Sequence, residues 1–343
     1  MKFEMPNTDD RPLWDVWLSS LWMPAVTAAD ELGLFDTVAK KPGTVRELIR
    51  ETGFPARGME ILLPLLAALG FLAVRRGSYQ ITSSTRNYLL KDSPYYWGGL
   101  LERTRALSPM HAAVRDAVSI GKGLRATHPA EPNRPADAWA SGEIDLERAR
   151  GVARFMHSHS LPAALGAARH GDFNGVKRLL DVGAGSGCFA ITLAQRFPDM
   201  RCTIMDLPAM CRVAAGYISE GEVADRVDTR PVDMFRQPWP EGYDAAFFSN
   251  IFHDWSFETC AELARKAHAI LPPGGRIYLH EMLINDSGDG PLTAAAFSVL
   301  MLLGTEGRQF TFTELAELLE QAGFRDVAAS ATYGYYSLVT GRK

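Results

Sequence analysis

The sequence predicts an α/β protein with two parts: a mostly helical N-terminal domain of the winged-helix type and a Rossmann-like, doubly wound C-terminal domain. Two observations carry this prediction. A helix, turn, helix and hairpin pattern occupies the first quarter of the chain. Strand-like apolar runs then alternate with amphipathic helices through the second half. The length of 343 residues suits about two domains.

The first helices are expected over residues 13–40, where apolar side chains recur at helical spacing. Gly33 is expected to end a helix in the left-handed conformation. Thr44 is followed three residues later by Glu47, the spacing of a capping box. This pattern predicts a short helix that ends near Glu51.

A second helix around Ile61–Leu69 precedes two short strands, Phe71–Val74 and Tyr79–Thr82. This winged-helix order raises a DNA-binding hypothesis, in which the second helix would read the major groove. A reading helix presents polar side chains to base edges, whereas this helix is dominated by Leu and Ile. The net charge of −4 also provides no positive field. We therefore expect a packing or dimerisation role and no nucleic-acid partner.

Several features favour a cytoplasmic protein without a membrane partner. The first ten residues contain no apolar run, so no signal peptide is expected there. The most apolar stretch, Leu62–Val74, is broken by Pro64 and Gly70 and is too short to span a bilayer. Four scattered cysteines, without a Cys-x-x-Cys pattern, predict reduced and packed thiols.

The domain boundaries follow from composition. Residues 121–145 are rich in Gly, Pro, Asn and Asp and are expected to connect an N-terminal domain at 1–120 with a C-terminal domain at 146–343. The C-terminal domain is expected to open with a helix from about Leu146 to Arg169. Its strand candidates are Arg178–Val182, Arg201–Met205, Arg230–Val232, Ala245–Ser249, Arg276–Glu281, Val327–Thr332 and Tyr336–Thr340. Such alternation predicts a mostly parallel sheet.

A glycine-rich loop follows the first of these strands. Gly183, Gly185 and Gly187 allow a tight turn and a close approach of a ligand to the backbone. The dinucleotide fingerprint Gly-x-Gly-x-x-Gly is not met, because Cys188 stands where its third glycine belongs. Asp181 immediately precedes the loop and would repel a pyrophosphate but attract an aminium group. The loop therefore favours S-adenosylmethionine over a dinucleotide.

Two further aspartates follow the next strands. Asp206 is placed to accept hydrogen bonds from the hydroxyl groups of a ribose. Asp233 is placed to meet the adenine end of a nucleoside, with Met234 and Phe235 packing on the ring. Three carboxylates at successive strand ends beside a glycine loop predict a nucleoside site.

His253 is the candidate catalytic residue. It follows the apolar strand that ends at Ser249, so it lies at the carboxyl end of the sheet, where open α/β folds bind ligands. A neutral imidazole at that edge can remove a proton from a phenol while its oxygen attacks a methyl group.

These segments resemble the small-molecule O-methyltransferases of plants and bacteria, whose members include the caffeic acid and hydroxyindole enzymes. The resemblance covers nearly the whole chain. Its motifs are Asp181–Gly187, Asp206–Pro208, Asp233–Phe235, His253–Trp255, Leu271–Gly275, His280–Leu283 and the segment from Phe312 to Phe324. It implies that the N-terminal domain forms a homodimer, and that the enzyme methylates small aromatic molecules of secondary metabolism with S-adenosylmethionine.

The resemblance also implies roles for single residues. His253 corresponds to the general base, Glu281 to the acidic residue that orients it, and Met301 to a methionine that grips the acceptor ring. Further cofactor ligands are implied at Ser160, Leu207 and Ser249. The acceptor, a flat apolar ring, is expected to contact Phe155, Met156, His159, Phe252, Asp254, Met282, Phe297, Met301 and Gln309.

Three positions depart from the family pattern. Gln309 stands where a second acidic partner of the histidine is expected, with Glu306 nearby. Ser249 stands where many members carry Lys. His157 and His159 add imidazoles that could join His253 around a metal, but the family needs none and we expect no metal.

Three other functions stay open on the sequence alone. The methyl group could go to a ring carbon ortho to a phenol, as in a C-methyltransferase for a phenolic or aromatic amino acid. The protein could instead bind S-adenosylmethionine without transferring the methyl group and promote a decarboxylation or a rearrangement. A winged-helix regulator that senses a metabolite is the remaining alternative.

Overall fold

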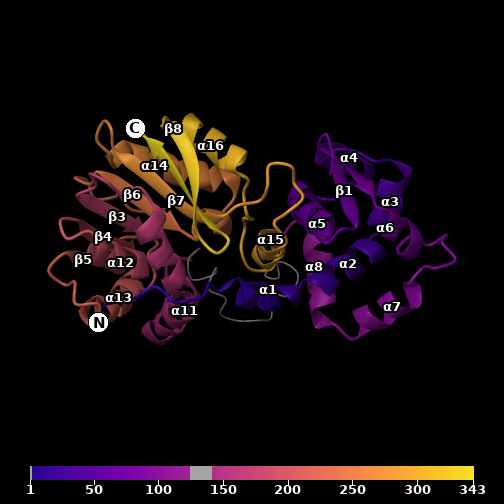
Figure 1. Ribbon diagram of the computed structural model, residues 1–343, viewed down its shortest axis with the longest axis horizontal. Coiled ribbons are helices and arrows are strands. Elements are labelled where there is room, and N and C mark those ends of the chain that lie inside the picture. The colour runs from indigo at the N-terminus through magenta and orange to yellow at the C-terminus, as the bar shows by residue number, and fades with distance from the viewer. Residues whose placement is uncertain (1, 124–140) are drawn as a thin grey trace. The chain divides into compact units, whose positions relative to one another are not determined.

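The computed structural model describes residues 2–123 and 141–343 (Figure 1). Its contacts divide the chain into two compact units. The sheet unit comprises Met1–Arg11, Asn133–Met282 and Phe312–Lys343, and the helical unit comprises Pro12–Pro132 and Leu283–Thr311. The division into domains at 1–120 and 146–343, joined by residues 121–145, stays a prediction. Residues 124–140 of the connecting region lie outside the described part. The units themselves interleave along the chain.

Helices dominate the helical unit. Its elements are α1 (Arg11–Ser19), α2 (Trp22–Glu31), α3 (Leu34–Lys40), α4 (Val45–Thr52), α5 (Ala56–Ala68), β1 (Leu72–Arg75), β2 (Ser78–Ile81), α6 (Ser83–Tyr88), α7 (Gly98–Ala106), α8 (Pro109–Ile120) and α15 (Leu292–Gly304). Helix α15, although late in the sequence, packs against α5 and α8. Its apolar side chains therefore belong to the core of this unit.

The local signals of the helical unit are confirmed. Gly33 has a φ of +67° between α2 and α3. Thr44 opens α4 with a capping box, because its Oγ1 accepts from the Glu47 N–H and the Glu47 carboxylate accepts from the Thr44 N–H. Strands β1 and β2 form the antiparallel hairpin, with Leu72 opposite Ile81.

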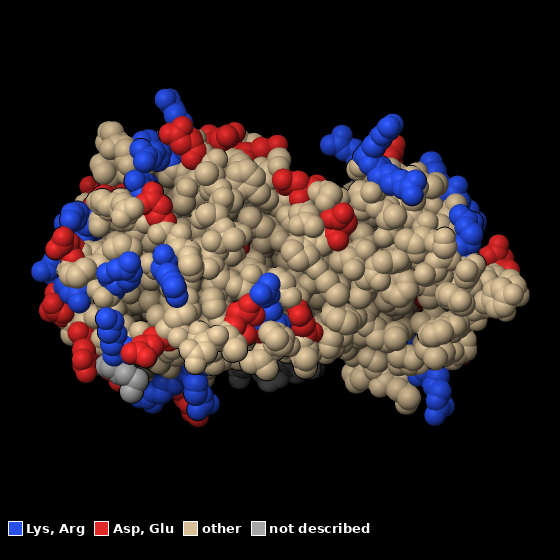
Figure 2. Space-filling model, in the orientation of Figure 1, with Lys and Arg blue, Asp and Glu red and all other residues tan. Residues whose placement is uncertain are grey.

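Helix α5, the potential reading helix, is buried as its composition predicts. Every residue from Ile61 to Leu66 is buried, so these side chains pack in the core and are not presented to solvent. Figure 2 shows that basic and acidic side chains are interspersed over the visible face of the sheet unit. This arrangement creates no single-sign field on that face.

The sheet unit is built on seven strands in the order β5-β4-β3-β6-β7-β9-β8. Strand β9 is antiparallel to both of its neighbours, and the other pairs are parallel. The strands are β3 (Arg178–Val182), β4 (Arg201–Asp206), β5 (Val227–Pro231), β6 (Ala245–Ser249), β7 (Arg276–Met282), β8 (Arg325–Tyr333) and β9 (Tyr336–Arg342). The doubly wound, Rossmann-like class is confirmed.

One strand was predicted three residues too late. Strand β5 begins at Val227, which pairs with Cys202 of β4. This edge strand is largely exposed, and its residues Asp228, Thr229 and Arg230 are polar, so the sequence shows no apolar run there.

Helices cover the sheet. Helix α11 (Leu146–His170) packs with α12 (Cys188–Arg196) and α13 (Pro208–Glu220), while α14 (Phe257–Ile270) packs with α16 (Phe312–Gln321) (Figure 1). No helix in the described part of the chain has the length and apolarity needed to cross a membrane. All four cysteines are buried free thiols, as predicted.

Candidate active site

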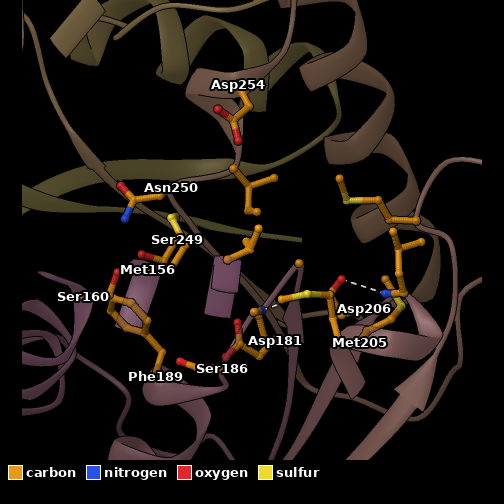
Figure 3. A pocket seen from close by; sticks show the side chains of 18 of the residues that line it. Met156, Ser160, Asp181, Ser186, Phe189, Met205, Asp206, Ser249, Asn250 and Asp254 are labelled. Atoms are coloured by element: carbon orange, nitrogen blue, oxygen red, sulfur yellow. Dashed lines mark hydrogen bonds between the residues drawn. The ribbon is translucent and has the colours of Figure 1, made fainter. Parts of the chain in front are cut away.

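A pocket lies at the carboxyl ends of neighbouring strands in the sheet unit (Figure 3). Parallel strands end at one edge of a sheet, so the residues that follow β3, β4, β5 and β6 meet there. The pocket is lined by Val152, Met156, Ser160, Asp181, Gly183–Cys188 without Gly187, Phe189, Met205–Leu207, Met210, Val232–Phe235, Ser249–Ile251, Asp254 and Trp255.

The glycine loop takes its shape from left-handed backbone. Gly183, Gly185 and Gly187 have φ values of +68°, +60° and +76°. A Cβ on Gly183 would lie 2.5 Å from Cδ1 of Ile251. Gly187 begins helix α12, and a Cβ there would collide with Ile204. Gly183 and Gly185 line the pocket, whereas Gly187 serves the close packing of helix on strand.

Asp206 ties the glycine loop to the end of β4. Its Oδ2 accepts from the Gly185 N–H at 2.8 Å, and its Oδ1 accepts from the Leu207 N–H at 2.7 Å. Burial raises the pKa of Asp206 to about 6, against the effect of these two hydrogen bonds. The carboxyl is therefore held rigidly at the floor of the pocket.

Asp181 is the more deeply buried of the two. Only 2% of its surface is exposed, and its Oδ2 accepts from the Ala190 N–H at 3.2 Å. Burial raises the pKa of Asp181 to about 8, and the nearby Asp206 adds to the rise. A carboxyl in this state becomes favourably ionised when a cation enters beside it.

The charges of the pocket select the sign of its ligand. Four aspartates line it, and no Lys, Arg or His occurs among the described lining residues. A pyrophosphate would find no lining cation here and four carboxyls beside it, while an aminium and a sulfonium would be stabilised. The pocket thus fits S-adenosylmethionine and disfavours a dinucleotide.

The far end of the pocket has an aromatic wall. The rings of Phe235 and Trp255 meet edge to face at 4.6 Å. Asp233 beside them pairs with Arg236 at 2.7 Å, and burial is outweighed by this pair and by backbone N–H groups, so the pKa of Asp233 is lowered. Flat rings and an ionised acceptor are features that suit a nucleobase.

Helix α11 supplies the pocket's other wall. Val152, Met156 and Ser160 are spaced four residues apart, so they share one face of the helix and line the pocket together. The first half of α11 also packs through Ala149 and Ala153 on Leu207 and Met210. This packing fixes the wall against the end of β4.

His253 lies beside this pocket in a 3-10 turn, Phe252–Asp254. It is 3% exposed, and its Nδ1 lies 2.6 Å from Oε2 of Glu281 on β7. The other carboxylate oxygen of Glu281 accepts from the backbone N–H groups of Ile251 and Phe252 at 3.1 and 3.0 Å. Glu281 therefore holds both the turn and the imidazole.

The ionisation of His253 reflects opposed effects. Burial favours the neutral ring, but the charge of Glu281, with a smaller effect of Asp254, outweighs it and raises the pKa of His253. Asp254 lines the pocket with Oδ1 3.8 Å from Nε2 of His253. Burial raises the pKa of Asp254 to about 7, against the attraction of His253.

The predicted acceptor residues fall into different surroundings. Met156 and Asp254 line the pocket. Burial, with a smaller effect of the nearby His253, lowers the pKa of His159 to about 4. Phe155 is 55% exposed, with its ring 5.3 Å from that of His159. Phe252 and Met282 have no exposed surface, while Phe297, Met301 and Gln309 belong to the helical unit.

Several residues that line or support the pocket are not predicted from the sequence. Asn250 has a φ of +54° at the end of β6 and lines the pocket. Ser186 in the glycine loop bonds His157 at 2.9 Å, and His157 also stacks on Tyr217 at 4.6 Å. Helical spacing from Met156 could have revealed Val152, but no local pattern signals a left-handed asparagine or a serine–histidine contact.

Fold and pocket together define an enzyme of the Rossmann-like class with a site for a cationic nucleoside and a buried histidine–glutamate pair beside it. Comparison with known proteins agrees with this class. The O-methyltransferase domain matches residues 128–325, and the O-methyltransferase dimerisation domain matches residues 14–91. The chain belongs to the O-methyltransferase family and is an S-adenosylmethionine-dependent methyltransferase.

Two curated relatives span nearly the whole chain. The 3-hydroxy-5-methyl-1-naphthoate 3-O-methyltransferase of Streptomyces sahachiroi is 32% identical over 95% of this chain and 93% of its own length. The L-tyrosine C(3)-methyltransferase of Streptomyces lavendulae is 30% identical over 87% of this chain and 82% of its own length.

Two solved structures resemble the protein throughout. An O-methyltransferase family 2 protein from Planctomyces limnophilus, in complex with apigenin, has a TM-score of 0.86 at 26% identity and covers 100% of both chains. Human N-acetylserotonin methyltransferase in complex with SAM has a TM-score of 0.60 at 26% identity and covers 99% of both chains.

Proposed function

We propose that the protein transfers the methyl group of S-adenosylmethionine to the phenolic oxygen of a small aromatic metabolite, with His253 as general base. The observation that carries this proposal is the buried His253–Glu281 pair, 2.6 Å apart, next to a pocket with four aspartates. A pocket for a cationic methyl donor beside a tuned imidazole suits oxygen methylation.

Each residue of the cofactor site has a proposed role. Asp181, with Gly183, Gly185 and Ser160, holds the amino-acid end, and its burial makes it responsive to an aminium. Asp206 and Leu207 bind the ribose, and Asp233, Met234 and Phe235 bind the adenine. Ser249 ends β6, the strand next to the one that carries Asp181, and contacts the methionine part of the cofactor.

The chain's own groups align the acceptor and remove its proton. The bound cofactor supplies a methyl group on a sulfonium, which is a good leaving group. A phenol has a pKa of about 10, so a neutral imidazole positioned to accept its proton lowers the barrier to attack. Nδ1 of His253 faces Glu281, and Nε2 is the nitrogen that takes the phenol proton. Glu281 stabilises the imidazolium that results.

The acceptor is proposed to be a flat aromatic ring from secondary metabolism. The relatives support this class, since one is named for a hydroxynaphthoate and one structure holds apigenin. Asp254 and His159 provide polar contacts near His253. Phe155 and Met156 of the sheet unit complete the proposed set.

A screen of phenols and aromatic amino acids with methyl-labelled S-adenosylmethionine tests the function. The expected product is an aryl methyl ether, identified by the carbon shift of a methoxy group. A methyl group on a ring carbon would support the C-methyltransferase alternative. One relative, the L-tyrosine C(3)-methyltransferase, is named for that reaction. Substrate conversion without S-adenosylhomocysteine would support the non-methylating alternative.

We also propose that the protein is a homodimer located in the cytoplasm. The dimerisation domain at residues 14–91 supports a homodimer. A monomer at micromolar concentration on a sizing column would contradict it. Four buried free thiols support a cytoplasmic location.

A further inference from the structure

A chain of polar groups runs behind the pocket through His280. This histidine has 0% exposure on β7 and lies between two hydroxyl groups. Its Nδ1 lies 3.2 Å from Oγ of Ser249, and its Nε2 lies 2.9 Å from Oγ1 of Thr332 on β8. The ring stacks on Tyr336 at 4.8 Å with an 8° angle between planes. His280 is thus fixed in orientation by contacts on its edge and its face.

The last bond of this chain fixes the direction of the others. The Thr332 hydroxyl donates to the Tyr336 carbonyl at 3.1 Å, and a carbonyl can only accept. The single Thr332 proton is then used, so its oxygen accepts from the Nε2–H of His280. Burial lowers the pKa of His280 to about 3, which keeps the ring neutral and leaves Nδ1 as an acceptor. Nδ1 therefore receives the Ser249 proton.

The opposite direction satisfies fewer groups. If Nδ1 carried the proton, it would donate to Ser249, and Thr332 would have to donate to Nε2. The Tyr336 carbonyl would then lose the Thr332 bond, and the Ser249 proton would need a partner in the pocket. In a buried network the direction that forms more hydrogen bonds is favoured.

We propose that His280 is a positioning residue that makes the Ser249 hydroxyl an acceptor toward the pocket, where it receives a hydrogen bond from the aminium of the cofactor. Ser249 lines the pocket, and Figure 3 shows it beside Asn250, away from Asp206. Strand β3, which carries Asp181, lies between β4 with Asp206 and β6 with Ser249, so Ser249 is on the side of Asp181 away from Asp206. The proposal rests on the proposed function, in which Asp206 binds ribose and Asp181 binds the aminium.

The direction of the chain can be measured in the unaltered protein. Histidine nitrogen shifts from a sample with labelled histidine distinguish the two neutral tautomers, and a His280→Gln variant identifies the signal among the eight histidines. We expect His280 to carry a proton on Nε2 and none on Nδ1. A proton on Nδ1 would overturn the proposal, whether or not the enzyme binds its cofactor.

Thr332→Val tests the effect on binding. Without the Thr332 oxygen, the ring gains by moving its proton to Nδ1, which turns the Ser249 proton toward the aminium. Calorimetry should then show S-adenosylhomocysteine binding about tenfold more weakly, since a hydrogen bond to a charged group is lost. Binding of 5′-methylthioadenosine, which lacks the aminium, should not change. Thr332→Ser keeps the hydroxyl and should bind both compounds like the wild type.

A double-mutant cycle separates positioning from general damage. In a Ser249→Ala background, Thr332→Val should cause no further loss of affinity for S-adenosylhomocysteine. An equal loss in both backgrounds, or an equal loss for both compounds, would contradict the proposal. A wild-type protein that binds neither compound would instead contradict the proposed function.

Discussion

Asp181 and Glu281 are each only 2% exposed, yet their surroundings differ. Glu281 has a histidine 2.6 Å away and two backbone N–H groups on its other oxygen. Burial, with a smaller repulsion from the nearby Asp206, raises the pKa of Asp181 to about 8, against the single backbone N–H that Asp181 accepts from. Glu281 therefore has its partner, His253, within the chain. Asp181 becomes fully ionised only when a cationic ligand arrives.

This difference assigns separate tasks to the two groups. A carboxylate that is already paired can tune and orient a base, because its charge is present throughout the reaction. A carboxyl that lacks a cation acts as a binding group, since its electrostatic cost is relieved on binding. Substitutions of His253, Asp181 and Glu281 test whether the two carboxyl groups have these separate tasks.

His253→Ala should lower kcat by about 10²- to 10⁴-fold, because a positioned general base is lost. The affinity for S-adenosylhomocysteine should stay within about threefold, since His253 is not among the residues that line the pocket. Turnover and calorimetry measure the two quantities. His170→Ala, at the exposed end of α11, is the matched control and should behave like the wild type. Near-normal turnover in His253→Ala would remove this residue from the mechanism.

Asp181→Asn should weaken S-adenosylhomocysteine binding by about 10- to 100-fold at pH 8, because the aminium loses a charged partner. In the wild type the affinity should rise as the pH rises toward and through 8, where Asp181 ionises. The variant should lose that part of the pH dependence. Asp199→Asn is the control, because the Asp199 side chain is 87% exposed. An unchanged affinity of Asp181→Asn for S-adenosylhomocysteine would contradict the role of Asp181 as the carboxyl that binds the aminium.

The same substitution should stabilise the ligand-free protein. The pKa of Asp181 is raised from 3.8 to about 8, so between these values the folded state holds more protons than the unfolded chain. Its contribution to stability therefore falls as the pH rises from 4 to 8. The Tm of Asp181→Asn should exceed that of the wild type by at least about 2 °C at pH 8 and should approach it near pH 4. Calorimetric melting at both pH values checks the sign.

Glu281→Gln should have the smallest effect on turnover, about tenfold in kcat, since His253 stays in place with a weaker partner. The charge of Glu281 raises the pKa of His253, so its removal lowers that pKa. The base then stays neutral to lower pH, and the acidic limb of the kcat profile should move to lower pH. A limb that moves to higher pH would show that Glu281 does not tune His253 in this way.

Local sequence patterns account for much of the fold. Alternating apolar runs located β3 and β6 at their observed bounds, and the spacing of Thr44 and Glu47 identified a capping box. The glycine loop and Asp206 follow a strand directly, so their meeting in one pocket could be anticipated from sheet geometry. The edge strand β5 was displaced because its exposed residues are polar.

Long-range contacts account for the rest. The grouping of α15 with the helical unit depends on packing against α5 and α8. The Ser249–His280–Thr332 chain joins three strands, and no spacing in the sequence indicates it. The burial of Phe252 and Met282, expected from the family resemblance to contact an acceptor, also depends on neighbours distant in sequence. Periodicity identifies such residues as apolar but does not say which surface they reach.

The most direct test of the account is calorimetry of S-adenosylhomocysteine binding at pH 7 in buffers of different ionisation enthalpy. Asp181 has a pKa of about 8 without ligand, so binding of a cation should release roughly one proton as this carboxyl ionises. NAD should produce no heat, because the described lining residues include no Lys, Arg or His to pair with its pyrophosphate. Proton uptake with S-adenosylhomocysteine, or binding of NAD in its place, would contradict the claim that this pocket holds a cationic nucleoside.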